Sequence, residues 1–177
     1  MARIINFIED RRVLMACTIL FIVMMMAFRE LTQYLGAPMF DTLQSGYDVT
    51  TMRELMLIYG EAGRQNYAYA TLSLDGVFPF IYGILAIGLL LKLAAFRFLR
   101  VLAILPLVVM GLDLYENVQL FGLLIQFPDL ASDAVARAST TTQLKGMAII
   151  ILLGAVVMQL VLRVVVTVYR QFDADQS

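Results

Sequence analysis

Residues 101–127 read VLAILPLVVMGLDLYENVQLFGLLIQF, an apolar run interrupted by Asp113, Glu116 and Asn117. A helix needs about 20 mostly apolar residues to cross a hydrocarbon core about 30 Å thick, and this run is long enough. Three further runs of similar length and composition lie at residues 13–35, 67–93 and 140–168. We therefore predict an all-α fold, a four-helix transmembrane bundle that forms a single domain over residues 1–177.

The composition agrees with a membrane protein. Hydrophobic residues make up 61% of the chain and charged residues 15%, against about 45–50% and about 25% in soluble domains. The formal net charge of −1 provides no basic surface for nucleic acid. The chain has no His, and Cys17 is its only cysteine. These absences exclude an internal disulfide, a zinc site built on His or Cys, and catalysis by a His base, and nothing in the sequence predicts a cofactor.

The basic residues predict an orientation in the membrane. Most of them gather at one end of the predicted spans: Arg3, Arg11, Arg12, Lys92, Arg97, Arg100, Arg163 and Arg170. Loops rich in Lys and Arg remain on the cytoplasmic side of the membrane. We therefore predict a bacterial inner-membrane protein whose N- and C-termini, and the connection between the second and third spans, are cytoplasmic.

The long outer connection between the first and second spans contains a helix signal. The sequence Thr51–Glu54 fits a capping box, in which a hydroxyl and a carboxylate each accept a hydrogen bond from a free N–H group of the first turn. Apolar side chains then recur at helical spacing, at Met52, Leu55, Met56 and Tyr59. We predict a short amphipathic helix over residues 52–59, with Gly60 as its C-cap. Such a helix either lies flat on the membrane surface, which is the simpler interpretation, or closes over the bundle.

Polar and ionisable side chains fall at one depth of the predicted spans, in the outer third of the bilayer. Asp113, Glu116 and Asn117 have the spacing i, i+3, i+4, which places them on one helical face. A charge that faces lipid costs at least a few kcal/mol, so this face should point into the bundle. The other spans contribute Asp75, Lys145 and Arg29 at a similar depth.

Pro79 gives Asp75 a second distinguishing feature. Proline cannot donate a hydrogen bond to the carbonyl four residues earlier, and its ring clashes with that carbonyl. The helix should therefore bend and free the carbonyl of Asp75 beside its own carboxylate, on the face that also carries Tyr82. A freed carbonyl next to a carboxylate is a reasonable half-site for a cation, a water or a ligand amine. Pro106 is predicted to free the carbonyl of Leu102 in the same way.

Two interpretations of the polar set remain open. Pairs such as Lys145 with Glu116, or Arg29 with Glu30, can simply fix the register of the helices, at about 0.6 kcal/mol per polar contact. However, the carboxylates outnumber the cations, and the surplus must be protonated, hydrated or neutralised by another group. We predict a ligand-binding site, with no catalytic residue and no metal site, formed by Asp75, Asp113, Glu116, Asn117, Lys145, Arg29 and Tyr82.

A pattern over residues 59–145 resembles small, uncharacterised bacterial integral membrane proteins with four helices. The residues that carry the resemblance are Tyr59-Gly60, Gly63-Arg64, Tyr67, Asp75, Phe78-Pro79, Tyr82, Leu105-Pro106, Asp113 and Glu116-Asn117. The resemblance implies the fold and brings no activity. The sterol-isomerase-like membrane fold is similar in its acidic residues and Pro-bent helices, but its enzymes use His and Trp, which this chain lacks. Small multidrug exporters are similar in using a membrane carboxylate, but they carry it on their first helix.

Together these observations predict a non-enzymatic inner-membrane protein with a charged pocket that opens toward the outer face. The pocket is expected to bind a membrane lipid or an amphipathic small molecule, or to dock a membrane partner or a second copy of the chain. Its acids would recognise a cation or amine, and Lys145 and Arg29 would pair with them or contact phosphate. One alternative is a proton- or cation-coupled transporter. Another is a lipid-modifying enzyme that uses carboxylate-bound Mg²⁺ or Ca²⁺.

Overall fold

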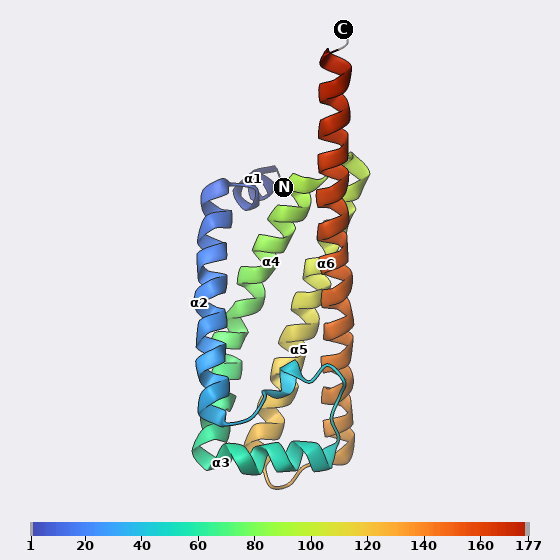
Figure 1. Cartoon of the computed structure of the whole chain (residues 1–177). Coiled ribbons are helices and arrows are strands. Elements are labelled where there is room, and N and C mark those ends of the chain that lie inside the picture. The colour runs from blue at the N-terminus through green and yellow to red at the C-terminus, as the bar shows by residue number, and fades with distance from the viewer. Residues whose placement is uncertain (1, 176–177) are drawn as a thin grey trace.

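The computed structural model describes residues 2–175, and within that range every regular element is a helix. The predicted four-helix bundle is confirmed (Figure 1). Its spans are long and apolar enough to cross a membrane, so the chain is a multi-pass membrane protein. They cover Arg11–Leu35, Val49–Leu93, Arg97–Gln126 and Ser132–Phe172.

Helices α1 (Ala2–Ile8) and α2 (Arg11–Leu35) form the N-terminal part of the bundle. The carboxylate of Asp10 caps α2 by accepting a hydrogen bond from the Arg12 N–H at 2.7 Å. Gly36, with φ of 70°, ends the helix in the left-handed conformation, which glycine adopts without a steric penalty. The main packing partner of α2 is α4 (Leu74–Leu93).

Helix α3 (Val49–Leu72) contains the segment predicted as a short surface helix, but it is longer and differently capped. Asp48 is the N-cap and accepts a hydrogen bond from the Thr51 N–H at 2.8 Å, so the predicted capping box does not start the helix. Gly60, with φ of 66° and ψ of 179°, is a bend inside α3 and not its end. Before the bend α3 lies across the end of the bundle opposite the termini, and after it the chain runs toward α4 (Figure 1).

The transverse part of α3 closes over the bundle. Met52 and Met56 are both 0% exposed and belong to a core cluster with Leu120 and Leu123. The interpretation as a helix lying flat on the membrane therefore needs correction, because the apolar face of this segment covers the ends of α5 (Leu105–Gln126) and α6 (Ser132–Asp175).

The connection between α2 and α3 folds into the bundle. It contains a short 3-10 helix, η1 (Phe40–Thr42), and the backbone N–H of Phe40 donates to the Tyr67 hydroxyl at 3.0 Å. Phe40 is fully buried and packs against Tyr47, Tyr59 and Tyr67. Non-helical backbone is tolerated at membrane depth where protein surrounds it, and here the aromatic side chains provide that cover.

The third and fourth spans differ from their predicted limits. The 3-10 helix η2 (Arg97–Ile104) precedes α5, and Pro106 lies in the first turn of α5. Pro106 therefore begins a helix instead of bending one. The carbonyl of Leu102 is not free, since it accepts a hydrogen bond from the Leu105 N–H. Helix α6 has 44 residues, about 66 Å at 1.5 Å per residue, and extends well beyond the bundle (Figure 1).

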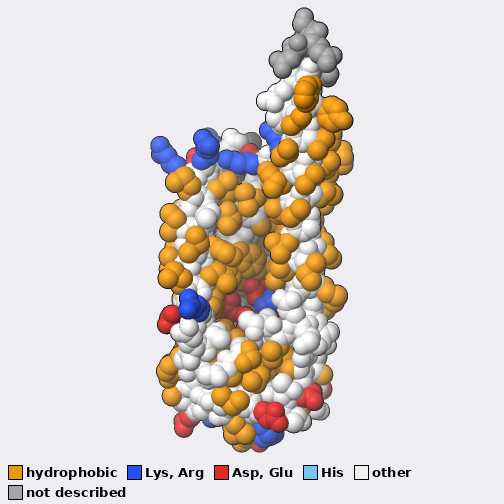
Figure 2. Space-filling view, viewed as in Figure 1, with side chains coloured by type: hydrophobic (Ala, Val, Ile, Leu, Met, Phe, Trp, Pro, Cys, Tyr) orange, Lys and Arg blue, Asp and Glu red, His pale blue; other side chains and the backbone are white. Residues whose placement is uncertain are grey.

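Two apolar clusters stabilise the bundle. The larger lies at the end covered by α3, around Phe40, Met52 and Tyr67. The smaller lies in the other half, around Leu90, Val109 and Leu152. The N-terminus, η2 and the C-terminal end of α6 share the end opposite the transverse part of α3 (Figure 1). Basic side chains gather at that same end (Figure 2).

Candidate functional site

A cavity of about 720 Å³ lies between α2 and α6, with α4 and α5 behind it. On this face of the molecule the surface is hollowed between the two helices, and acidic and basic side chains lie in the depth of the hollow (Figure 2). The cavity has a charged end near the loop of residues 36–48 and an apolar length toward the opposite end of the bundle.

An ion-paired triad forms the centre of the charged end. The Lys145 Nζ on α6 lies 2.9 Å from the Asp113 Oδ1 on α5 and also pairs with the Glu116 carboxylate. The three residues are only 6%, 5% and 0% exposed, respectively. The i, i+3 spacing of the acids placed both on the face of α5 that meets α6, as predicted. The triad connects the two helices across one buried cation.

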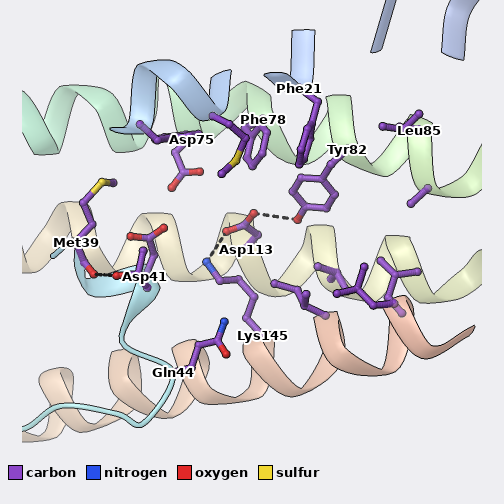
Figure 3. A pocket seen from close by; sticks show the side chains of 18 of the residues that line it. Phe21, Met39, Asp41, Gln44, Asp75, Phe78, Tyr82, Leu85, Asp113 and Lys145 are labelled. Carbon is purple, nitrogen blue, oxygen red and sulfur yellow. Dashed lines mark hydrogen bonds and ion pairs between the residues drawn. The ribbon is translucent and has the colours of Figure 1, made fainter. Parts of the chain in front are cut away.

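Hydroxyl groups complete the environment of the triad. The Tyr82 hydroxyl on α4 donates to the Asp113 Oδ2 at 2.9 Å (Figure 3). Thr142 on α6 donates to the Glu116 Oε1. Each acid thus has one partner besides the lysine. Charges that are removed from water need such additional hydrogen bonds to be tolerated. Thr142 was not predicted, because a helical threonine usually bonds its own backbone, as it also does here with Ala138.

Pro79 frees the backbone carbonyl of Asp75 as predicted, but this carbonyl already has a hydrogen-bond donor within the protein. The Asn117 Nδ2 on α5 donates to this carbonyl at 2.9 Å. Asn117 therefore takes the position that the sequence assigned to a cation, a water or an amine. The interaction joins α4 to α5 where the first turn of α4 begins.

The carboxylate of Asp75 differs from the other acids of the site. The residue is 5% exposed and lines the cavity, into which its carboxylate points (Figure 3). Within residues 2–175 it has neither a hydrogen-bond donor nor an ion-pair partner. Lys145 is engaged with Asp113 and Glu116. Asp75 is thus a buried acid that faces open space.

Asp41 is a site residue that the sequence analysis missed. It belongs to η1 and lines the cavity (Figure 3). It accepts a hydrogen bond from the Tyr67 hydroxyl at 3.2 Å. Asp41 lies outside the membrane-spanning helices, and burial raises the pKa of its carboxyl group above the ordinary value. Nothing periodic in the sequence indicates this role, and the only signal is the apolar pair Met39-Phe40 directly before it.

Arg29 has a more peripheral position than predicted. It is exposed on α2 and contributes to the edge of the cavity. Within the described residues it forms no ion pair, and the suggested pairing with Glu30 is not formed. The structure therefore places four of the predicted residues in the lining of the charged end, with Arg29 at its rim: Asp75, Tyr82, Asp113 and Lys145. Glu116 and Asn117 do not line the cavity and contact these residues from behind it, through Lys145 and the Asp75 carbonyl.

The remainder of the cavity is apolar and opens sideways. Its lining includes Met25 on α2, Leu85 and Leu89 on α4, and Leu153 and Val156 on α6. The loop of residues 36–48 covers the outer end, since Met39, Thr42 and Gln44 also line the cavity. The predicted opening toward the outer face is therefore corrected to one between α2 and α6, where a membrane would place lipid chains (Figure 2).

Aromatic side chains form one wall at the junction of the charged end and the apolar length. The ring of Phe78 lies 5.3 Å from Phe21, 5.2 Å from Phe28 and 5.3 Å from Tyr82, measured between centroids. All of these residues line the cavity. Phe78 is one helical turn after Asp75, so the aromatic wall and the free carboxylate are adjacent (Figure 3).

Among residues 2–175 there is no group of three or more His, Cys, Asp or Glu side chains arranged to hold a metal ion. The sequence matches no protein-family model, and comparisons with curated proteins and with solved structures find no similar protein.

Proposed function

We propose that this chain is an inner-membrane protein, with its N- and C-termini in the cytoplasm, that binds an amphipathic molecule or lipid from the bilayer in the cavity between α2 and α6. The observation that carries the proposal is a buried charged end joined to an apolar length that opens sideways. Such a cavity matches a molecule with a polar head and a hydrocarbon chain. Its volume of about 720 Å³ lies within the roughly 300–1,000 Å³ of small-molecule sites.

A purely structural role explains only part of the site. The pairs that Lys145 forms with Asp113 and Glu116 connect α5 to α6 and would do so without any ligand. In the part of the chain that the structure describes, Asp75 and Asp41 have no such cation. Ionisable groups inside a membrane are costly and usually mark a functional site. These two acids therefore favour a ligand-binding role over a role limited to fixing the register of the helices.

The apolar half of the bundle favours binding over transport. A translocation path needs polar access from both sides of the membrane. In the half that carries the termini the cavity is lined by apolar side chains, among them Val109 and Leu152, which belong to the cluster with Leu90 and Ala155. Gln159, the buried polar residue of that half, is engaged with the Leu99 carbonyl at 3.1 Å. A ligand that leaves and re-enters through the lateral opening fits this arrangement.

Native mass spectrometry of the protein in its own membrane patch tests the proposal. We expect a stoichiometric extra mass of lipid or amphiphile size. Met25→Trp should reduce this occupancy, because Met25 lines the cavity and a larger side chain fills it. Met26→Trp is the matched control, since the neighbouring side chain is exposed away from the cavity. Equal occupancy in both variants, or no extra mass in the wild type, would contradict the proposal.

The orientation is tested separately by cysteine labelling in a Cys17→Ser background. Phe98→Cys places a thiol on η2, and Asp129→Cys places one on the connection between α5 and α6. In intact spheroplasts, a membrane-impermeant maleimide should label position 129 and not position 98. The reverse pattern would mean that the termini lie outside.

A further inference from the structure

The charged end of the cavity has an excess of negative charge. Lys145 is shared by Asp113 and Glu116, and Asp41 and Asp75 line the same end without a cation of their own. Arg29 contributes only at the rim. A buried ionised carboxylate needs a counter-charge, because the loss of hydration otherwise costs many kcal/mol. The missing partner is therefore positive.

The two unpaired acids come from different elements and point into one space. Asp75 is placed by the first turn of α4 and Asp41 by η1, and both carboxylates point into the same end of the cavity (Figure 3). The Tyr67 hydroxyl occupies one oxygen of Asp41. When the acids are ionised, their remaining oxygens can accept hydrogen bonds but cannot donate them. A group with several N–H donors and a positive charge satisfies such a set.

The aromatic wall favours the same chemistry. Phe78 and Tyr82 line the cavity next to Asp75, and Phe21 and Phe28, which also line it, pack against Phe78. The face of an aromatic ring attracts a cation within about 6 Å of its centroid. Carboxylates beside aromatic faces thus favour a small cationic head group that is attached to a hydrocarbon chain. An inorganic ion has no chain to contact the apolar length of the cavity.

We propose that the cavity binds an amphiphile with an ammonium group, which lies between Asp41 and Asp75, while the hydrocarbon chain of the amphiphile occupies the apolar length. This inference rests on the proposed function and names its ligand class. The lining residues extend from Thr32 to Phe21 on α2, about 16 Å at 1.5 Å per residue, which is the scale of one alkyl chain. The ammonium group belongs either to a free amphiphile or to a lipid with an ethanolamine headgroup.

The experiment compares probes that share one chain and differ in head charge. The protein is reconstituted in phosphatidylcholine nanodiscs and titrated with dodecylammonium, dodecanol or dodecyl sulfate, and bound probe is counted by native mass spectrometry. The wild type should bind dodecylammonium most tightly and dodecyl sulfate least. Asp75→Asn and Asp41→Asn should each weaken dodecylammonium binding about tenfold or more and leave dodecanol binding unchanged.

Glu30→Gln is the matched control. It removes one negative charge from α2, but residue 30 does not line the cavity. Its dodecylammonium affinity should equal that of the wild type, which separates the site from general attraction to a negative surface. Nanodiscs that also contain phosphatidylethanolamine identify the source of the ammonium group. Competition by this lipid points to a headgroup, and undiminished dodecylammonium binding points to a free amphiphile.

The outcomes separate this inference from the proposed function. Equal binding of all probes, blocked by Met25→Trp, would overturn the cationic ligand and retain amphiphile binding. Preference for dodecyl sulfate would also overturn it, because Lys145 and Arg29 would then be the recognising groups. If Met25→Trp reduces the binding of none of the probes, both this inference and the proposed function are overturned.

Discussion

Replacing Lys145 with Met tests whether the buried triad stabilises the bundle as its geometry indicates. The substitution keeps most of the aliphatic chain and removes the cation that, among the described residues, alone contacts Asp113 and Glu116. Both acids are almost fully buried, so at least one must take up a proton in the folded variant. For a glutamate of ordinary pKa this costs about 4 kcal/mol at pH 7, within the roughly 3–5 kcal/mol expected when one partner of a buried pair is removed.

The same reasoning predicts a pH dependence and a rescue. At pH 5 the protonation costs only about 1 kcal/mol, so the difference between variant and wild type should shrink as pH falls. The triple variant Lys145→Met, Asp113→Asn, Glu116→Gln leaves no uncompensated charge and should recover most of the lost stability.

Unfolding of the detergent-solubilised protein by sodium dodecyl sulfate, followed by circular dichroism at both pH values, measures these differences. A single variant within 1 kcal/mol of the wild type at pH 7 would refute the reasoning. So would a triple variant no more stable than the single one, because the loss would then come from packing of the lysine chain and not from charge.

Three further predictions concern the backbone and the loop. Gly60→Ala should destabilise the protein by roughly 1–3 kcal/mol, because φ of 66° with ψ of 179° is a conformation that essentially only glycine adopts; thermal unfolding measures this. Asn117→Leu should cost about 1 kcal/mol in the wild type and clearly less in a Pro79→Ala background, where the helix can supply an N–H to the Asp75 carbonyl; a double-mutant cycle measures the coupling. Asp41→Asn should raise the stability of the ligand-free protein at pH 7, because burial raises the pKa of this carboxyl group; unfolding from pH 4 to pH 8 measures it.

The sign of the Asp41 effect follows from proton binding. A group with a raised folded-state pKa binds more protons in the folded state, so stability falls as pH rises from its unfolded pKa through its folded pKa. The gain from Asp41→Asn should therefore be absent near pH 4 and grow as pH rises. Asp48 should have the opposite effect on the pH dependence of stability, because the hydrogen bond from the Thr51 N–H lowers the pKa of its carboxyl group. Its contribution to stability is lost as pH falls. Loss of stability at high pH in the Asp41 variant would contradict the assignment.

A control for Gly60 is also available in the chain. Gly154 lies in helical backbone of α6, and a Cβ there would meet nothing within 4 Å. Gly154→Ala should be neutral or slightly stabilising, since alanine is the better helix former. A Cβ at Gly60 likewise meets nothing, so a difference between the variants reports backbone conformation and not space. Equal stability of both variants would argue against strain at the bend.

The membrane spans and the inner polar face were predictable because strong physical constraints act locally. Runs of apolar residues specify spans, and the spacing of Asp113, Glu116 and Asn117 specifies one helical face. Pro79 specifies a freed carbonyl through covalent structure alone. For each of these features the information lies within one helical segment, so the sequence alone is enough.

The remaining features depend on tertiary packing. Asp41 becomes a site residue only because the aromatic side chains around Phe40 hold η1 inside the bundle. The lateral opening exists because α2 packs mainly on α4 while α6 packs mainly on α5, and no periodicity specifies which helices are neighbours. The sequence also did not predict which side chain donates a hydrogen bond to the Asp75 carbonyl, because the donor, Asn117, is far from Asp75 in the sequence.

The sideways opening of the cavity has a consequence for selectivity. A ligand that arrives from the bilayer has already transferred its chain out of water, at about 0.8 kcal/mol per CH₂ group. The apolar length of the cavity then offers the chain surroundings much like the lipid tails it leaves. Chain length should therefore set how much ligand enters the membrane, while the head group alone decides which dissolved molecule is retained. Affinities for the proposed amphiphile are therefore properly expressed as mole fractions in lipid. On that scale, differences in affinity report the few polar contacts at the charged end of the cavity.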